Sequence, residues 1–220
     1  MGIRQQTSDT MNPDDVKIAK RETPFRGYFR VDKYHLKHRL FEGGWSADFT
    51  REVFERGHAA CVVLYDADLD QVVLVEQFRI GAYAALSSPW WDDRASPWLL
   101  ELVAGIIDEG ETPEGVIRRE TLEEAGCEVG ELVPVVKYLV SPGGSSETMY
   151  IFCGQVDAAK ADGVHGMTEE HENIRVITIP AEDVFRRLDE GRINNSMTII
   201  GLQWLRQHHA DLRAKWRKRP

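Results

Sequence analysis

The alternation of apolar and polar positions divides the chain into two stretches of different character. Up to about residue 57 the positions alternate in short runs such as "YFRVDKYHLKHRL", and "EGG" supplies a turn before "SADFTREVFERG". This pattern predicts an antiparallel meander of half-exposed strands. Such a meander is too small to be stable alone and needs a partner surface. We therefore expect two domains, an N-terminal β-sheet domain at residues 1–57 and a larger domain at residues 58–220.

The second stretch mixes strands with helices. "AACVVLY" and "QVVLVEQFR" are dense β-branched runs joined by "DADLD", which predicts a hairpin in a buried sheet. Further strands are predicted at "LLELVAGII", "VVKYLV", "TMYIFCGQV" and "NIRVITIP", and helices at "AEDVFRRLDEG" and "SMTIIGLQWLRQHHADLRAKW". "GAYAALSSPWWDDRASPW" has no clear period and is expected to be a loop. Hairpins together with a central helix favour a mixed β-sheet core flanked by helices, of the α/β or α+β class.

The central helix has clear signals at both ends. Thr112 is suited to the N-cap, Pro113 to the first turn and Gly126 to the stop, so the helix is predicted from Pro113 to Ala125. On a helical wheel of about 100° per residue, three glutamates share one arc, and four less polar residues occupy the other side. The glutamates are Glu120, Glu123 and Glu124, and the residues opposite are Ile117, Thr121, Leu122 and Ala125.

Converging carboxylates suit a hard divalent cation, because Mg²⁺ prefers oxygen ligands. A second acidic group, Glu169, Glu170 and Glu172, follows Gly166 in a predicted loop, which fits a mobile element. The alternative interpretation of the helix is a solvated acidic face, which most runs of charge are. The alternative for the loop is an ordinary acidic surface segment.

Composition narrows the classes of partner. The formal net charge of −9 leaves no basic footprint, so we expect no nucleic acid. Cys61, Cys127 and Cys153 are odd in number and widely spaced, which argues against a disulfide framework or a zinc knuckle and fits a reducing cytosol. The start "MGIRQQTSDTMNPDD" lacks an apolar segment, and no apolar run approaches the length of a membrane span. We expect no signal peptide, no membrane association and a cytoplasmic location.

The acidic helix belongs to a longer pattern, G-x5-E-x7-R-E-x2-E-E-x-G, with fixed positions at Gly105, Glu111, Arg119, Glu120, Glu123, Glu124 and Gly126. The pattern resembles the Nudix box of the Nudix hydrolases, enzymes that cleave nucleoside diphosphates linked to another moiety. One departure is Thr121, where the family usually has an aliphatic residue; threonine is isosteric with valine, so we expect little consequence. The resemblance implies the Nudix fold, an α+β/α/β sandwich with a mixed β-sheet core flanked by helices and a small N-terminal antiparallel β-sheet domain.

The resemblance extends from about Lys17 to Trp216 and is to the bacterial ADP-ribose pyrophosphatase subfamily. It is carried by "RETPFRGYF", "REVFERGHAA", "VLVEQFRIGAY", "LELVAGIIDEGE", "SPGGSSE" and "VHGMTEEHENIRV", and by a proline at Pro142. It implies hydrolysis of ADP-ribose to AMP and ribose 5-phosphate with Mg²⁺, or Mn²⁺, and two or three ions per site. An alternative is another nucleotide sugar, such as GDP-mannose or ADP-glucose. A non-catalytic ADP-ribose sensor would have an eroded box and an added DNA-binding domain, and neither is present.

The resemblance also implies roles for individual residues. Metal ions would be held by Glu120, Glu124, Glu172 and the backbone carbonyl of Ala104. Glu170 would be the general base, Glu123 would support the catalytic site, and Arg119 and Glu111 would pair to brace the loop against the helix. Gly105 and Gly126 would be structural. The choice of base among Glu169, Glu170 and Glu172 stays open.

Substrate recognition in similar enzymes uses both subunits of a homodimer in which the N-terminal domain is swapped. Tyr28 and Phe29 would flank the adenine. The adenosine and phosphates would be lined by Arg51, Glu52, Arg56 and Arg79, with Ile106 also at the substrate site, and the terminal ribose by Ser141, Pro142, Gly143 and Glu147. Any one of these arginines alone is more often a surface ion-pair partner, and it is their conjunction with the box that favours substrate binding. The segment around Trp90 and Trp91 is longer than in the relatives, and its role, packing or a reshaped site or dimer contact, stays open.

Overall fold

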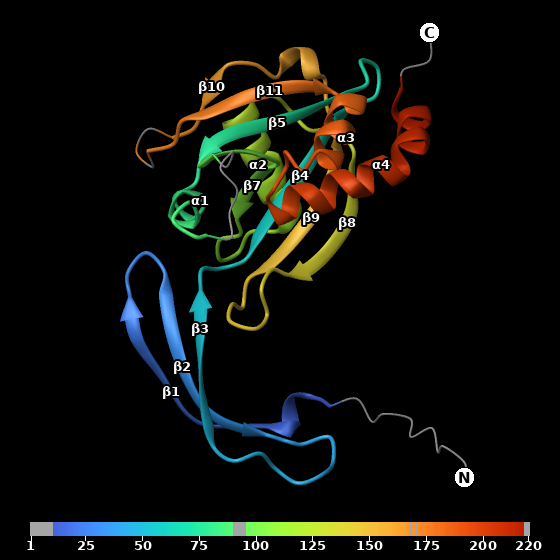
Figure 1. The fold of residues 1–220 in the computed structure, drawn as a ribbon. Coiled ribbons are helices and arrows are strands. Elements are labelled where there is room, and N and C mark those ends of the chain that lie inside the picture. Colours follow the sequence, from blue (N-terminus) through green and yellow to red (C-terminus); the bar gives the residue numbers. More distant parts are fainter. Residues whose placement is uncertain (1–10, 90–95, 168, 170, 218–220) are drawn as a thin grey trace, which may run out of the picture. The chain divides into compact units, whose positions relative to one another are not determined.

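The computed structural model describes residues 11–89, 96–167, 169 and 171–217, which form two compact units (Figure 1). The N-terminal unit comprises the described residues up to Arg56 together with Ser141–Glu147. The main unit comprises Gly57–Val140 and the described residues from Thr148 onward. Within the described ranges, no helix is both long enough and apolar enough to cross a membrane.

The N-terminal unit is a three-stranded antiparallel sheet in the order β1 (Val16–Arg26), β2 (Arg30–His38), β3 (Phe49–Glu55). The predicted meander is therefore confirmed. A short 3₁₀ turn, η1 (Pro13–Asp15), precedes it. The segment 141–147 joins the unit through the Phe54 amide, which donates to the Gly144 carbonyl at 2.8 Å. Nearly every residue of β1 is exposed, so the sheet has no apolar core of its own.

The main unit contains an eight-stranded mixed sheet within the described residues. Its main path runs β10-β11-β5-β4-β9-β8, with β6 beside β5 and β7 beside β4. Only the β4–β9 pair is parallel among the pairs of this sheet, which confirms the predicted mixed sheet. The strands are β4 (Ala59–Asp66), β5 (Gln71–Phe78), β6 (Trp98–Glu101), β7 (Val103–Ile106), β8 (Leu132–Leu139), β9 (Thr148–Gln155), β10 (Val164–His165) and β11 (Ile174–Pro180).

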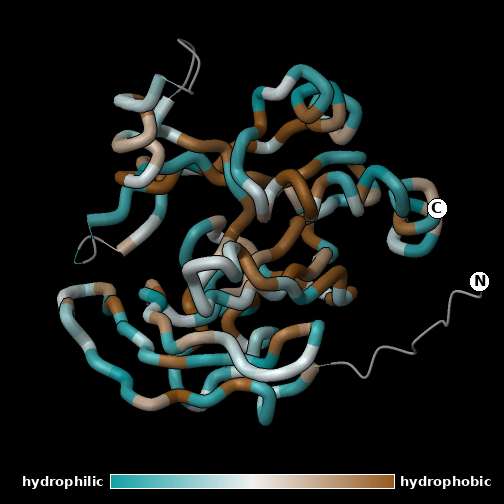
Figure 2. Tube along the Cα trace, turned by 60° about the horizontal axis from the view of Figure 1, so that its bottom comes forward, coloured by the Kyte–Doolittle hydropathy of each residue, from teal (hydrophilic) through white to brown (hydrophobic). Residues whose placement is uncertain are grey.

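Strand β4 shows how the core is divided between the two faces of this sheet. All of its residues are buried, and successive side chains point to opposite faces. Val62 and Leu64 pack in one apolar cluster with α2 (Pro113–Ala125), whereas Val63 packs in the other with α3 (Ala181–Asp189) and α4 (Ser196–Trp216). Figure 1 shows α2 on one face of the sheet and α3 and α4 on the other. The main unit is therefore a layered sandwich, and Figure 2 shows hydrophobic segments, in brown, gathered towards the centre.

Several local expectations were wrong. The predicted loop after β5 contains a short helix, α1 (Ile80–Ala85), which is too short to show a helical period in the sequence. The single strand predicted at "LLELVAGII" is split at the buried Leu102 into β6, which pairs with β5, and β7, which pairs with β4. The short elements β10 and η2 (Ala158–Lys160) were not predicted. Trp90 and Trp91 lie outside the described residues.

Candidate active site

Helix α2 has the predicted bounds and the predicted caps. The Thr112 hydroxyl accepts a hydrogen bond from the Gly115 amide at 3.1 Å, and Pro113 occupies the first turn. Gly126 ends the helix with φ of 66°, a left-handed conformation that favours glycine. The helix packs on the sheet through Val116 and Ile117, whose side chains are fully buried. These local signals fix where the acidic face begins and ends.

The side opposite the glutamates differs from the prediction at one residue. Leu122 is 56% exposed, because the sheet covers a narrower face than the helical wheel suggested. Thr121 is fully buried, and its hydroxyl donates to the Ile117 carbonyl at 2.7 Å. A buried hydroxyl that bonds within its own helix leaves no unsatisfied polar group. This geometry agrees with the expectation that Thr121 substitutes for an aliphatic residue with little consequence.

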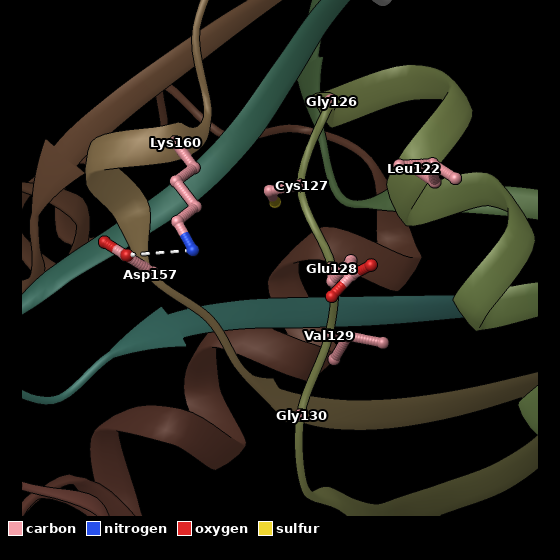
Figure 3. Close-up of a pocket in the computed structure, with 8 residues that line it drawn as sticks. All are labelled: Leu122, Gly126, Cys127, Glu128, Val129, Gly130, Asp157 and Lys160. Atoms are coloured by element: carbon pink, nitrogen blue, oxygen red, sulfur yellow. Dashed lines mark ion pairs between the residues drawn. The ribbon is translucent and has the colours of Figure 1, made fainter.

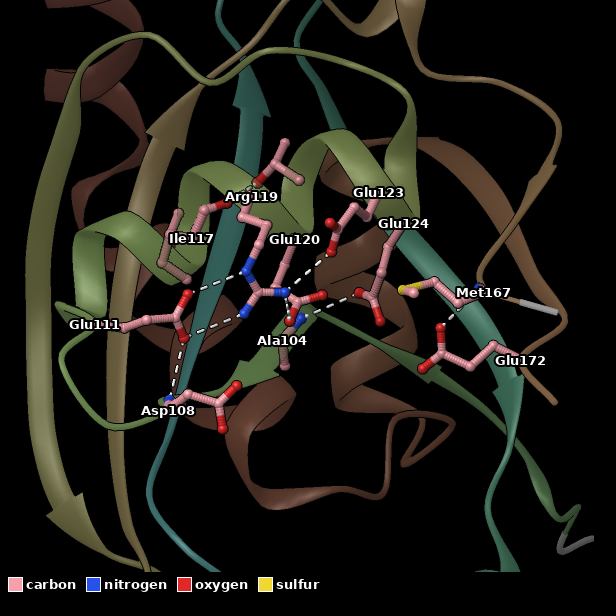
Figure 4. A network of polar contacts seen from close by, with 11 residues as sticks. Ala104, Asp108, Glu111, Ile117, Arg119, Glu120, Glu123, Glu124, Met167 and Glu172 are labelled. Carbon is pink, nitrogen blue, oxygen red and sulfur yellow. Dashed lines mark hydrogen bonds and ion pairs between the residues drawn. The ribbon is translucent and has the colours of Figure 1, made fainter. Parts of the chain in front are cut away.

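Arg119 lies among the carboxylates of the box (Figure 4). Its Nε donates to Glu111 Oε1 at 3.2 Å, so the pair expected from the resemblance is present. Its Nη1 also donates to Glu120 at 2.8 Å and to Glu123 at 3.0 Å. The guanidinium thus offsets part of the repulsion among the glutamates. The hydrogen bonds from Arg119 and from the Asp108 amide lower the pKa of Glu111, which braces the loop before the helix.

Glu124 differs from its neighbours because it is buried and forms no ion pair with any residue that the structure describes. It is 4% exposed, and its carboxylate accepts one hydrogen bond from the Ala104 amide at 3.2 Å. Burial, together with the charge of Glu120, raises the pKa of Glu124 to about 8. Burial also raises the pKa of Glu120, against the opposing charge of Arg119. The site therefore holds carboxylates in an environment that disfavours their negative charge.

Gly105 makes room for this arrangement. A Cβ atom at that position would lie 1.9 Å from Glu120 Oε1, so any side chain on β7 here would displace the glutamate. Gly126 is constrained in a second way as well, because a Cβ there would lie 2.7 Å from the ring of His165 on β10. Both glycines of the box therefore hold structural positions, one beside a candidate ligand and one at the helix end.

The late acidic loop is described only in part. Glu170, expected to be the general base, lies outside the described residues. Glu172 is half-buried, and its carboxylate accepts a hydrogen bond from the Met167 amide at 3.1 Å (Figure 4). Its charge contributes to raising the pKa of both Glu120 and Glu124. The fold therefore brings this loop residue within electrostatic reach of two box carboxylates.

The carboxylates suit a hard cation in chemistry, although each has a protein partner. Glu120 pairs with Arg119, Glu124 with the Ala104 amide, and Glu172 with the Met167 amide. In the part of the chain that the structure describes, no three side chains of His, Cys, Asp or Glu are grouped closely enough to hold an ion. A bound cation would relieve the repulsion among Glu120, Glu124 and Glu172.

A partly buried ion pair, not anticipated from the sequence, lies on the neighbouring strands. Arg79, which follows β5, donates from Nε to Glu101 Oε2 at 2.7 Å. Glu101 is 3% exposed, and burial raises its pKa against the charge of Arg79. The sequence signal was the lone acid in the apolar run "WLLELVAG". A carboxylate at a buried strand position needs a partner, which this pattern alone does not identify.

The N-terminal unit brings together some of the predicted substrate residues. Tyr28 is 87% exposed, and its ring meets that of Phe29 edge-on at 4.9 Å between centroids. The Arg56 guanidinium lies over the Phe29 ring at 5.8 Å and forms an ion pair with Glu147 at 3.4 Å. Within this unit, an aromatic face, a cation and a nearly buried carboxylate are therefore adjacent.

The other predicted substrate residues are more dispersed. Arg51 stacks on Phe49 at 4.6 Å and donates to its neighbouring carbonyl, while Glu52 is exposed opposite Lys33. Ser141, Pro142 and Gly143 form an exposed turn in which the Ser141 carbonyl accepts the Ser145 amide at 2.8 Å. Arg79 and Ile106 belong to the main unit, where Ile106 ends β7 and is 36% exposed.

A pocket of about 530 Å³ lies at the C-terminal end of α2 (Figure 3). It is lined by Leu122, Gly126, Cys127, Glu128, Val129, Gly130, Asp157 and Lys160. Lys160 and Asp157 form an ion pair within it at 3.6 Å. It contains none of the candidate metal ligands. This pocket is therefore separate from the candidate active site, which is identified by its buried carboxylates.

The fold and the acidic helix agree with comparisons to known proteins. The NUDIX domain family matches residues 55–199, which is more than half of the chain. The chain belongs to the NUDIX family. A solved structure described as an ADP compounds hydrolase superimposes with a TM-score of 0.67, covering 90% of this chain and 97% of that one, at 20% identity. That likeness confirms the expected fold. Nudix hydrolases use a divalent metal such as Mg²⁺.

Named relatives narrow the comparison further. The ADP-ribose pyrophosphatase of Escherichia coli (strain K12) is 47% identical, covering 94% of this chain and 95% of that protein. That of Haemophilus influenzae is 41% identical and covers 98% of both chains. The GDP-mannose pyrophosphatase of Yersinia pestis is 35% identical and covers 83% of this chain and 87% of its own. The near full-length likeness to ADP-ribose pyrophosphatases confirms the resemblance inferred from the sequence.

Proposed function

We propose that this chain is a Mg²⁺-dependent ADP-ribose pyrophosphatase that hydrolyses ADP-ribose to AMP and ribose 5-phosphate. The observation that carries the proposal is the 47% identity to the E. coli ADP-ribose pyrophosphatase over 94% of the chain. The intact box supports it, because Arg119 and the three helix glutamates are all present and converge on one face of α2. An eroded box would have favoured a binding module.

The metal would be held by Glu120, Glu124, Glu172 and the carbonyl of Ala104. These are oxygen donors, and the raised pKa of Glu124 marks a place where positive charge would be stabilising. We propose Mg²⁺, with Mn²⁺ as a substitute and two or three ions per site. Bound there, the ions would neutralise phosphoryl oxygens and lower the pKa of the attacking water.

The chain's own residues would supply the proton transfer and the support of the ligands. We assign Glu170 as the general base, in the loop that begins at Gly166 with φ of 104°. A carboxylate on such a loop can accept the proton of the attacking water once substrate is bound. Glu123 is exposed and bonded to Arg119, so it would support the site by holding the guanidinium. Glu111 and Arg119 would keep the preceding loop against the helix.

Substrate contacts would come from both subunits of a homodimer. Tyr28 and Phe29 would flank the adenine, and the exposure of Tyr28 supports this. Arginine suits phosphates through its planar fork of donors. The adenosine and phosphates would be met by Arg51, Glu52, Arg56 and Arg79, with Ile106 beside them, and the terminal ribose by Ser141, Pro142, Gly143 and Glu147.

The N-terminal domain is proposed at residues 1–57 and the main domain at residues 58–220. In a homodimer, the N-terminal domains of the two subunits would be swapped. The support is the exposed apolar surface of the three-stranded sheet, including Val16, Ile18 and Phe25. A small sheet without a core needs such a partner. We expect light scattering of the full chain to give twice the monomer mass, and a monomer would contradict the swap. We also propose a cytoplasmic location, since the three cysteines are free and buried.

The direct test is hydrolysis of ADP-ribose, GDP-mannose, ADP-glucose and NADH, with Mg²⁺ and with EDTA. We expect ADP-ribose to be preferred and all turnover to require the metal. Preferential turnover of GDP-mannose, the substrate named for the Yersinia relative, would replace the proposed substrate but keep the metal site. Tight ADP-ribose binding without turnover of any substrate would instead indicate a sensor.

The proposed base needs its own variant. Glu170→Gln is expected to lower kcat strongly while ADP-ribose binding is retained. Glu169→Gln is the matched control, since Glu169 is the exposed neighbour in the same loop. A larger loss in Glu169→Gln than in Glu170→Gln would transfer the assignment of the base.

A further inference from the structure

Glu101 is a buried carboxylate that the proposed mechanism does not use. It is 3% exposed on β6, and its ion-pair partner is Arg79, at 2.7 Å. Only the carboxylate is buried, because the Arg79 side chain is 42% exposed, and the cost of removing a carboxylate from water offsets much of what such a pair returns. Burial raises the pKa of Glu101 against the charge of Arg79, so the environment disfavours the charged form of this carboxylate. The retention of a charged group at this position calls for a reason other than stability.

Arg79 is held at two points. Its backbone amide donates to the Pro97 carbonyl at 2.8 Å, and its Nε donates to Glu101. Glu101 is itself placed by the pairing of β6 with β5, in which it lies opposite Val75. In the described part of the chain, Arg79 forms no ion pair other than that with Glu101. A contact through Nε leaves both Nη groups for an anion, which arginine can bind in a bidentate manner.

The face of β5 that leads to Arg79 is the one that meets the acidic helix. Val73 and Val75 pack in the same apolar cluster as residues of α2, and alternation along the strand places Gln77 with them. The charge of Arg79 lowers the pKa of Glu124, so the guanidinium lies within electrostatic reach of the box. Gln77 is 6% exposed, and among the described residues its side-chain nitrogen has no hydrogen-bond partner. This face therefore offers donors beside the carboxylates.

We propose that Glu101 is a positioning residue that holds Arg79 Nε and thereby directs the two Nη groups toward the diphosphate of the substrate. The inference rests on the proposed function, because it takes the diphosphate of a nucleotide sugar as the anion that Arg79 binds. Glu101 itself touches no substrate. It fixes the orientation of the Arg79 side chain, which is 42% exposed and would be free to adopt many rotamers without the ion pair.

The test combines Glu101→Gln with Arg79→Ala in a double-mutant cycle on ADP-ribose hydrolysis. Gln is close in volume to Glu but cannot hold the guanidinium by charge. We expect Glu101→Gln to raise KM about tenfold and to change kcat less than about threefold, the signature of lost binding that is uniform between ground and transition states. In the Arg79→Ala background, Glu101→Gln is expected to have no further effect, because its effect passes through Arg79.

Two further variants and a stability measurement complete the design. Glu76→Gln is the matched control, since Glu76 lies on β5 and pairs with Arg175 instead. It is expected to keep the wild-type KM. Thermal unfolding of Glu101→Gln is expected at or above the wild-type temperature. If Glu101→Gln does not fold, Glu101→Asp serves as the test instead. Aspartate keeps the charge, but its shorter side chain places the carboxylate farther from Arg79, so KM should rise by an intermediate factor.

Several outcomes would overturn the proposal. The first is a wild-type KM in folded Glu101→Gln or, if that variant does not fold, in Glu101→Asp. The second is a loss of activity confined to kcat. The third is an effect of Glu101→Gln on KM that is as large in the Arg79→Ala background as in the wild type. Failure of the proposed function is seen separately, in the wild-type chain. A wild type that turns over no nucleotide sugar removes both inferences before any variant is made.

Discussion

Asp32 in the N-terminal unit and Glu124 in the main unit are both buried acids, but their environments are opposite. Asp32 is fully buried and accepts hydrogen bonds from Thr23 at 2.7 Å and Arg30 at 3.0 Å, as well as from Arg21. These bonds, that from Arg21 foremost, lower its pKa to about 2. Glu124 accepts one backbone hydrogen bond and neighbours other glutamates, and its pKa is raised to about 8.

The difference shows what buried charge contributes to each unit. Among its described residues, the N-terminal unit buries only Asp32 and Glu147, each paired with arginine. It is held by backbone ladders and charge pairs. The main unit has an apolar core on both faces of its sheet, which offsets the cost of an unbalanced carboxylate. A site that destabilises its own unit in this way is typical of function, since active sites are often maintained at a cost in stability.

The largest expected effect is on catalysis. Glu124→Gln should lower kcat on the order of 10³-fold, because it removes a candidate metal ligand. It should leave thermal stability unchanged or raised, since a buried, repelled charge disappears. Glu123→Gln is the control, as its carboxylate is exposed and bonded to Arg119. Equal losses in the two variants would mean that burial does not distinguish these glutamates.

The next effect tests the apolar core that carries Glu124. Leu64→Ala should lower the free energy of unfolding by about 3 kcal/mol, because Leu64 is fully buried in the cluster beneath α2. Leu122→Ala, at an exposed position of α2, is the matched control and should change it by less than about 0.5 kcal/mol. Denaturant unfolding measures both. Similar values would contradict the placement of Leu64 in the core.

The two acids should have opposite effects on the pH dependence of stability. The lowered pKa of Asp32 means that its contribution is present above about pH 4 and is lost as the pH falls toward about 2. The raised pKa of Glu124 means that stability is lost as the pH rises from about 4.5 toward about 8 in the absence of metal. Hydrogen exchange of peptides from β1–β3 and from α2 separates the two.

Variants complete the pH experiment. Asp32→Asn should remove the loss of stability at low pH in β1–β3. Glu124→Gln should reduce the change of stability with pH near neutral pH in α2. The comparison would be contradicted if stability changed with pH in the same direction in both sets of peptides. It would also be contradicted if Asp32→Asn left the pH dependence in β1–β3 unchanged, or if Glu124→Gln left that in α2 unchanged.

The smallest expected effect is that of salt. Raising NaCl from about 0.1 M to about 1 M shortens the screening length from about 10 Å to about 3 Å. Exposed pairs such as Lys20–Glu22 should weaken slightly, because solvent already screens them. We expect faster hydrogen exchange in β1–β3 and little change in β4. Equal change in both units would contradict the view that only one depends on charge pairs.

Much of the fold could be predicted because its signals are local. The caps at Thr112 and Gly126 and the helical period between them gave the bounds of α2 correctly. The β-branched runs on either side of "DADLD" gave β4 and β5. Neighbouring residues determine these features through hydrogen bonds and turn geometry that reach only a few positions along the chain.

Other features depend on distant segments and could not be predicted. The helical wheel placed Glu123 and Glu124 on one arc, but only the contact with β7 makes the second buried and the first exposed. Glu101 and Arg79 are 22 positions apart and meet because β6 pairs with β5.

By itself, the sequence determined the type of most elements, the acidic face of α2 and the family to which the chain belongs. The tertiary structure decided which carboxylates are buried, which are paired with arginine and which pKa values are raised or lowered. The physical reason is that helix caps and hydrophobic periods are short-range properties. Desolvation and Coulomb interactions instead depend on which strands of the folded chain surround each charge.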